Sequence, residues 1–272
     1  MAAVFEGVQS ASGIGTLTIT KPTGLAVGDI LVASVFGGGG GDVSTPSGWT
    51  SLITVNTDYD VYRARCFTKT ADASDVAATN FAFSNSYGGF CYGFLSRLSG
   101  VAYDKITTYN RSNSATSSVS YTGVTPASAD SLFIIVSAFG NGGGSSPYFS
   151  SYAMATSNPT WTEQVEYDNV GGFASSIASA TRSASTATGN ISLNISGLNA
   201  NSDVYSYLLV FLPTANVATT PTTVDLVSTI PPTLFPMSIT SAVPAVTIVQ
   251  ENGIWTNDTQ TATPTWVNDT QS

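Results

Sequence analysis

Strand-like patterns recur along the first 213 residues of the chain, whereas helical periodicity is nearly absent. Residues 16–20 alternate strictly between threonine and an aliphatic side chain, and residues 29–36 form an apolar run that ends at a glycine stretch, residues 37–41. Strict alternation is typical of a half-buried strand, and a short apolar run bounded by turn residues is typical of a strand buried on both faces. The sequence therefore predicts an all-β protein.

The expected strands fall into two series that resemble each other. The first comprises residues 16–20, 29–36, 49–55, 61–70, 80–83 and 90–98, and the second comprises residues 117–121, 131–139, 161–167, 172–181, 189–195 and 203–212. Each series has a buried run followed by glycines, a turn with Pro and Trp, and an aromatic closing strand. A repeat of this length fits two similar halves of sheet better than a solenoid.

We therefore predict a jelly-roll-like antiparallel β-sandwich body over residues 1–213, with internal halves of about 1–100 and 101–213. The halves either combine into one sandwich or form two small sandwiches. A Pro/Thr-rich linker is expected over residues 214–250, because proline disfavours central strands. Residues 251–272 form a Trp-containing tail repeat, so the body is expected to carry an extended C-terminal arm.

The C-terminal segment is apolar enough to need a partner. Trp255 and Trp266 begin similar six-residue sequences, and Phe235 lies in the linker. Aromatic side chains bury a large apolar area and are frequent at interface hot spots, so these three residues are candidate anchors on a neighbouring protein. The alternative is a hairpin that folds back onto its own domain.

The charge of the chain argues against nucleic acid as a partner. Eight basic residues face seventeen acidic ones, and no Lys or Arg follows Arg182. Binding to a phosphate backbone needs a basic surface that releases counterions. The surface must instead be built mainly from Ser, Thr, Asn and Gly, because only 9% of the residues are charged.

No catalytic residues are assigned. The chain lacks histidine, which removes the usual general base and the Ser-His and Cys-His pairs. A polysaccharide depolymerase that uses two carboxylates stays open as a less favoured alternative. The candidate acids are Asp42, Asp58, Asp60, Glu163, Glu166 and Asp168.

No metal or cofactor is expected. Asp58 and Asp60 place two carboxylates on one side of an extended segment, which is a weak calcium signal without EF-hand spacing. Cys66 and Cys91 are too few for a disulfide framework and are read as buried free thiols, with a single bridge as the alternative.

The two glycine-rich stretches are candidate recognition loops rather than phosphate loops, since neither is followed by Lys-Ser or by a helical pattern. Binding residues are proposed in and near them. They are Gly37, Gly39, Gly41, Tyr148, Phe149 and Tyr152.

The N-terminal sequence has no basic region followed by an apolar core, and no apolar run reaches the ~20 residues that span a bilayer. We therefore expect synthesis and folding in a cytoplasm and no membrane partner.

Three motifs carry a resemblance to a known class of protein. They are GDILVA at residues 28–33, PSGWT at residues 46–50 and FTK at residues 67–69. Together they resemble a β-sandwich module of tailed-bacteriophage structural proteins, such as minor tail, tail fibre and head decoration proteins. The resemblance covers about residues 1–213 and marks sandwich geometry more than any activity.

The resemblance implies a non-enzymatic virion protein exposed on the particle, in either a head decoration or fibre position or a tail or baseplate fibre position. Attachment through the C-terminal arm, other virion proteins as partners, and a homo-oligomer, with three copies favoured, are further implications. The second expected class is a surface adhesin that binds host glycans through its glycine-rich and aromatic loops.

Overall fold

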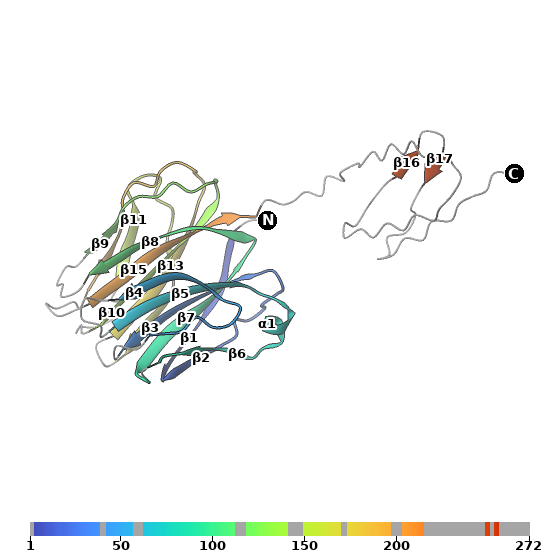
Figure 1. The fold of residues 1–272 in the computed structure, drawn as a ribbon. Coiled ribbons are helices and arrows are strands. Elements are labelled where there is room, and N and C mark those ends of the chain that lie inside the picture. Colours follow the sequence, from blue (N-terminus) through green and yellow to red (C-terminus); the bar gives the residue numbers. More distant parts are fainter. Residues whose placement is uncertain are drawn as a thin grey trace. The chain divides into compact units, whose positions relative to one another are not determined.

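The computed structural model describes residues 3–38, 42–56, 62–86, 88–111, 118–140, 149–169, 173–196, 203–214, 248–250 and 253–255. Most of them lie in antiparallel strands, and one short helix, α1 (Ala73–Ala77), interrupts the series (Figure 1). The chain divides into two units, Met1–Thr214 and Ala215–Ser272. The predicted all-β class is confirmed.

The first half contains β1 (Val4–Ile14), β2 (Thr16–Thr20), β3 (Ile30–Gly38), β4 (Thr50–Asn56), β5 (Tyr62–Thr70), β6 (Asn80–Ser84) and β7 (Phe90–Ser99). The second half contains β8 (Val101–Arg111), β9 (Ser118–Tyr121), β10 (Ser131–Gly140), β11 (Phe149–Met154), β12 (Thr162–Asn169), β13 (Phe173–Arg182), β14 (Ile191–Ile195) and β15 (Asp203–Pro213).

The two halves have the same topology. The first forms a five-stranded sheet in the order β1-β7-β3-β5-β4, and the second forms one in the equivalent order β8-β15-β10-β13-β12. A smaller sheet accompanies each: β2 pairs with β6, and β9 pairs with β14, which also carries the additional strand β11. The strand-for-strand match supports the two similar halves read from the sequence.

Irregularities in the strands are repeated as well. An extra residue interrupts the pairing of β1 between Phe5 and Gly7, and another interrupts β8 between its equivalents Tyr103 and Lys105. The pairing of β4 shifts between Ser51 and Ile53, and that of β12 shifts between Glu163 and Val165. β-Bulges of this kind bend an edge strand and redirect its side chains.

Each half is a small sandwich with its own core. The alternating side chains of β3 explain why: Leu31, Ala33 and Val35 face β2 and β6, where they join Leu17 and Phe83 in one buried cluster. In the second half an equivalent cluster lies between β10, β13 and β15 on one side and β9, β11 and β14 on the other. Of the two arrangements that the sequence left open, the structure has two small sandwiches.

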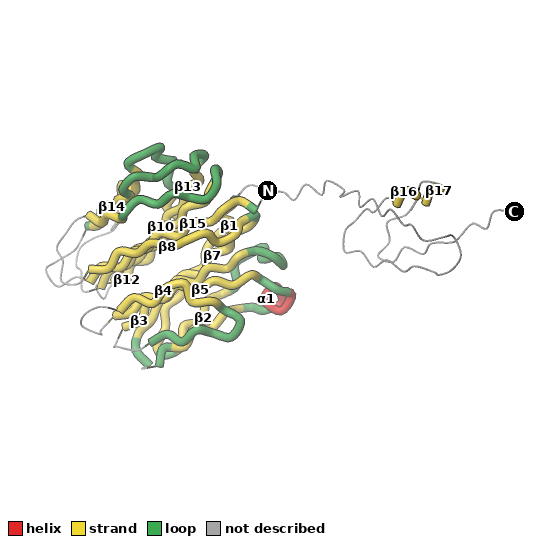
Figure 2. The backbone as a smooth tube through the Cα atoms, turned by 45° about the horizontal axis from the view of Figure 1, so that its top comes forward, coloured by secondary structure: helices red, strands yellow, loops and turns green. Residues whose placement is uncertain are grey.

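The sandwiches are fused through the opposite faces of their large sheets. Val32 and Phe36 of β3 belong to a third buried cluster, which also contains Ile134 and Val136 of β10. Figure 2 shows the resulting layers of strands, with the large sheets in the middle. The body is therefore one unit with a core that continues across both halves.

Stacked rings link the halves at one side of this shared core. The Tyr92 ring lies 5.1 Å from that of Phe36 and 5.6 Å from that of Tyr167, measured between centroids, and both pairs are close to parallel. Because Tyr167 comes from β12, the stack joins the sheets of the two halves. Aromatic pairs of this kind stabilise a contact beyond the area that they bury.

Two short strands occur in the second unit. Residues of β16 (Ile248–Gln250) pair with those of β17 (Gly253–Trp255), so that Trp255 lies opposite Ile248. Within the described residues, no helix has the length and apolar character needed to cross a bilayer.

Candidate functional site

The two glycine-rich stretches follow equivalent strands, β3 and β10. Gly37 is buried within β3, where it pairs with Arg63 and Cys91, so it belongs to the sheet rather than to a binding loop. The proposed binding residues Gly39, Gly41 and Tyr148 lie outside the described residues.

The aromatic residues proposed after the second glycine stretch have different positions. Phe149 is 1% exposed and packs against Phe139, so the prediction that it offers a ring to a ligand is wrong. The alternation of β11 turns Phe149 into the second core. Tyr152 is half-buried, its ring lies 6.0 Å from that of Trp161, and its hydroxyl shares a 2.6 Å hydrogen bond with Ser176.

Two candidate carboxylates lie beside Tyr152. The bulge in β12 turns Glu163 and Glu166 to the same face, although residues three apart in a regular strand face opposite sides. The Phe149 N–H donates to Glu166 Oε2 at 3.2 Å, so the pair lies where the edges of β11 and β12 meet.

Glu166 influences the ionisation of Glu163. Burial, and then the negative charge of Glu166, raise the pKa of Glu163, while a hydrogen bond from Tyr152 opposes the shift. Burial is also the main cause that raises the pKa of Tyr152. The structure thus brings together Tyr152, Glu163 and Glu166 as one polar group. Asp58, Asp60 and the side chain of Asp168 lie outside the described residues.

The equivalent edge of the first half carries the opposite charge. Arg65 of β5 occupies the position of Ser176 and forms an ion pair with Asp42, whose other carboxylate oxygen lies 3.9 Å from Arg63 Nη1. Burial lowers the pKa of Arg65, although Asp42 opposes that change. Asp42, one of the candidate acids, therefore serves as an ion-pair partner here.

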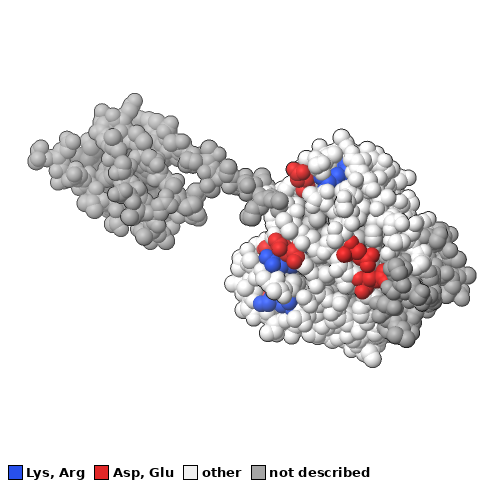
Figure 3. Space-filling view, turned by 180° about the vertical axis from the view of Figure 1, so that it is seen from behind, with Lys and Arg blue, Asp and Glu red and all other residues white. Residues whose placement is uncertain are grey.

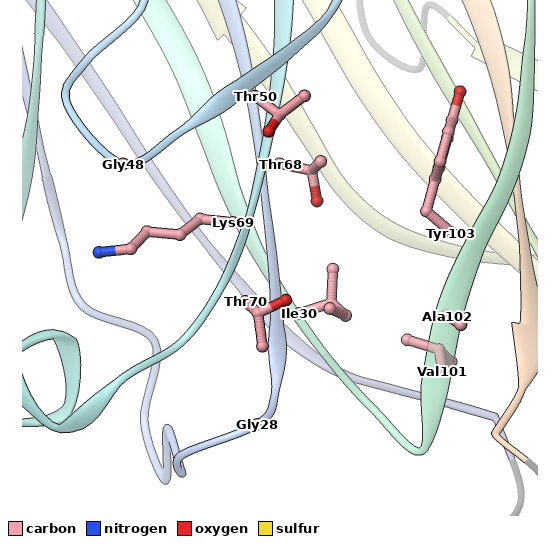
Figure 4. Close-up of a pocket in the computed structure, with 10 residues that line it drawn as sticks. All are labelled: Gly28, Ile30, Gly48, Thr50, Thr68, Lys69, Thr70, Val101, Ala102 and Tyr103. Atoms are coloured by element: carbon pink, nitrogen blue, oxygen red, sulfur yellow. The ribbon is translucent and has the colours of Figure 1, made fainter.

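A hollow opens where the two halves meet, and the sequence did not indicate it. It has a volume of about 420 Å³ and lies between the β3, β4 and β5 side of the first half and the beginning of β8 (Figure 4). The first half contributes Gly28, Ile30, Gly48, Thr50, Thr68, Lys69 and Thr70, and β8 contributes Val101, Ala102 and Tyr103. A volume in this range is typical of small-molecule sites.

Strand pairing explains the threonines in the hollow. Thr50 of β4 lies directly opposite Thr68 of β5, and Thr70 lies opposite Ile30 of β3. The Thr68 hydroxyl donates to the Leu31 carbonyl at 3.1 Å. Tyr103 faces this group from β8, and in Figure 4 the Lys69 side chain points away from it.

Charged side chains are sparse on the body. Figure 3 shows small groups of acidic and basic residues on one face, separated by uncharged surface. In the part of the chain that the structure describes, no three His, Cys, Asp or Glu side chains lie close enough to hold a metal ion.

Both cysteines are buried and carry free thiols, as the sequence predicted. Burial raises the pKa of Cys66 to about 12, and it also raises the pKa of Cys91. Nucleophilic chemistry requires the thiolate, which is suppressed at neutral pH in both positions.

The proposed anchors belong to the second unit. Trp255 ends β17, while Phe235 and Trp266 lie outside the described residues.

Comparison with known proteins found no relative of the chain. No protein family, no curated protein and no solved structure matches the chain.

Proposed function

We propose that the chain is a non-enzymatic structural protein of a bacteriophage virion, exposed on the particle and attached to neighbouring subunits through its C-terminal segment. One observation carries most weight: the double sandwich ends at Thr214, and the remaining chain forms a separate unit. A body that holds its core within itself needs no partner to fold. The following segment is then available for attachment.

The composition supports the same role. A surface with few charges suits close packing beside other subunits, because charged residues are depleted where interfaces are fully buried. Residues 28–33, 46–50 and 67–69 resemble phage β-sandwich modules, which is the reason for proposing a phage virion as the particle. This resemblance supports head and tail positions equally. Other virion proteins and further copies of this chain are the proposed partners.

The test is incorporation into particles. The full chain and a version that ends at Thr214 would each be expressed in cells infected with a phage from which the native gene has been deleted. Purified particles would then be examined by mass spectrometry and immunogold electron microscopy. We expect the full chain on the particle surface and the truncated chain only in the unassembled fraction. Absence of the full chain from particles would refute the proposal.

Two controls separate attachment from folding. The truncated chain should melt cooperatively in isolation, because its three buried clusters all lie before Thr214. A full chain with Trp255→Ala and Trp266→Ala should fold normally and incorporate less. Unfolding of the truncated chain would show that residues 215–272 are part of the core.

A glycan-binding adhesin is the second candidate. The Tyr152 and Trp161 rings beside Glu163 and Glu166 favour it, because sugars bind to aromatic faces flanked by hydrogen-bonding groups. A glycan array probed with residues 1–214 tests this candidate. Binding that is lost in Trp161→Ala would support it, and silence of the array would count against it.

A further inference from the structure

We propose that the hollow between β8 and the first sandwich binds a neutral saccharide, with Tyr103 as the stacking ring and the threonine hydroxyls as hydrogen-bonding groups. The hollow lies at the junction of the halves, on elements other than the glycine-rich loops and the Tyr152 group. It therefore does not depend on the proposed virion role.

The hollow offers hydroxyl groups on a rigid surface. Thr50, Thr68 and Thr70 lie on two paired strands, so their spacing is fixed by the ladder of the sheet. Thr50 and Thr70 are exposed to solvent, and Thr68 keeps acceptor capacity after donating to Leu31. Hydroxyls can both donate and accept, which suits a ligand that is itself rich in hydroxyls.

The positive charge in the lining of the hollow is neutralised by neighbouring carboxylates. Lys69 is the lone charged residue of the lining, and its Nζ lies 2.6 Å from Asp75 and 3.3 Å from Asp72. Burial raises the pKa of Tyr103, so the phenol keeps its proton. An anionic ligand would find no free cation in this lining and a cationic ligand no free carboxylate, which favours an uncharged ligand.

Tyr103 provides the aromatic surface. Among the described residues it is the one aromatic side chain with a large exposed area, at 37%. Its other side is supported by Phe211, whose ring lies 5.9 Å away in an edge arrangement. A supported and exposed ring is suited to stack on the apolar face of a sugar.

The duplicated half lacks this arrangement at the equivalent place. Phe5 replaces Tyr103 there, and Ser179 replaces Thr68. Gln164 Nε2 donates to the Ser179 hydroxyl at 2.8 Å, so the hydroxyl already has a partner. Thr162 and Thr181 keep the positions of Thr50 and Thr70, so Tyr103 and Thr68 are the residues that distinguish the hollow from the equivalent place.

The experiment is a calorimetric titration of the full chain with neutral trisaccharides of glucose, mannose, galactose, xylose and N-acetylglucosamine, each beside its monosaccharide. Sialyllactose and trigalacturonate serve as anionic counterparts. We expect at least one neutral saccharide to bind, and Tyr103→Ala to weaken it by roughly tenfold or more, as expected for loss of a stacking contact. Thr50→Val should weaken binding by a smaller factor while preserving shape.

Phe5→Ala is the matched control, because it removes a ring at the equivalent strand position without touching the hollow. It should leave the dissociation constant unchanged. Tyr103→Phe keeps the ring, and it tests the site even where Tyr103→Ala lowers stability. Failure of every neutral saccharide to bind, tighter binding of the anionic ones, or unchanged binding by both Tyr103→Ala and Thr50→Val would overturn the proposal.

Discussion

Equivalent loops in the two halves, after β5 and after β13, are held by side chains of opposite charge. After β5, the Asp72 carboxylate accepts from the Ser74 and Asp75 N–H groups at the start of α1, and Lys69 pairs with Asp75. After β13, the buried Arg182 takes over the role of organising the loop. The difference shows that the sandwich requires a fixed connection between these strands but permits different chemistry to hold it.

Arg182 holds its loop through carbonyl groups rather than through a carboxylate. Its Nε donates to Ser157 O at 3.3 Å, Nη1 donates to Ala184 O and Thr186 O at 2.7 Å, and Nη2 donates to Thr186 Oγ1 and Ala187 O. All five N–H groups of the guanidinium are therefore used.

The largest predicted effect follows from that geometry. Arg182→Ala removes a side chain that is 2% exposed together with all its hydrogen bonds, so we expect the free energy of unfolding to fall by about 3 to 4 kcal/mol. Urea denaturation of the variant measures the change. Lys69→Met in the first half should cost less, because it removes two ion-pair contacts rather than five hydrogen bonds, and Asp75 keeps the hydrogen bond from the Asp72 N–H. Equal losses would contradict the distinction between the two loops.

A second difference concerns a glycine in the first core. Gly93 of β7 occupies the position that Ser206 occupies in β15. A Cβ atom at Gly93 would lie 2.6 Å from the Ser34 carbonyl oxygen and 3.2 Å from the Val35 Cα atom. The first half thus has room only for glycine, whereas Ser206 shares hydrogen bonds with Tyr121 and Ser137.

Gly93→Ser copies the residue of the second half into the first. We expect a loss of about 2 to 3 kcal/mol, because the contacts are with backbone atoms that cannot turn away. Thermal unfolding followed by circular dichroism checks the prediction. Ser206→Ala, the control in the other half, should cost about 1 kcal/mol for the lost hydrogen bonds. A variant Gly93→Ser as stable as the parent would show that β7 shifts freely.

Much of this architecture could be predicted from the sequence. The residues that define the repeat, such as the aliphatic run of β3 and the Trp49 turn, are buried on both faces or fixed by a turn, so their patterns are strong. The three strands of the body that the sequence did not indicate, β1, β8 and β11, all lie at sheet edges. Edge strands are partly solvated and contain bulges, which weakens the alternation.

The candidate site was harder to predict. The hollow depends on packing between the halves, which places Tyr103 beside threonines of β4 and β5. Likewise, Glu163 and Glu166 share a face only because of a bulge that leaves no pattern in the sequence. The burial of Phe149 depended on strand β11, which has no counterpart in the first half.

The two halves differ in how their stability responds to alkaline pH, because both cysteines belong to the first half. The folded state keeps Cys66 protonated up to about pH 12, whereas the unfolded thiol ionises near its ordinary value of 9.0. The stabilising contribution is complete below pH 9 and is lost as the pH rises toward 12, by about 1.4 kcal/mol per pH unit. Cys91 acts in the same direction.

Urea denaturation between pH 8 and pH 10 tests this slope. Cys66→Val, which removes the titrating group, should reduce the dependence on pH without abolishing it. Rapid reaction of native Cys66 with a thiol reagent at pH 8 would contradict its burial.

The smallest predicted effect concerns a hydroxyl in the shared core. Tyr207 of β15 occupies the position that Phe94 occupies in β7, and its hydroxyl faces Ser34 and Cys66 of the first half. Among the described residues, neither the Tyr207 nor the Ser34 hydroxyl has a partner in hydrogen-bonding geometry. A buried hydroxyl without a good hydrogen bond contributes little to stability, because its desolvation is not offset.

We therefore expect Tyr207→Phe to change the free energy of unfolding by less than about 1 kcal/mol, in the direction of higher stability. Ser34→Val, which copies Val136 from the second half, should be tolerated better in the Tyr207→Phe background than alone, because no unpaired phenol remains beside it. A double-mutant cycle in urea measures this coupling. A loss above 2 kcal/mol for Tyr207→Phe would mean that the hydroxyl bonds across the two sandwiches, and that the shared layer is held by polar contacts as well as by apolar packing.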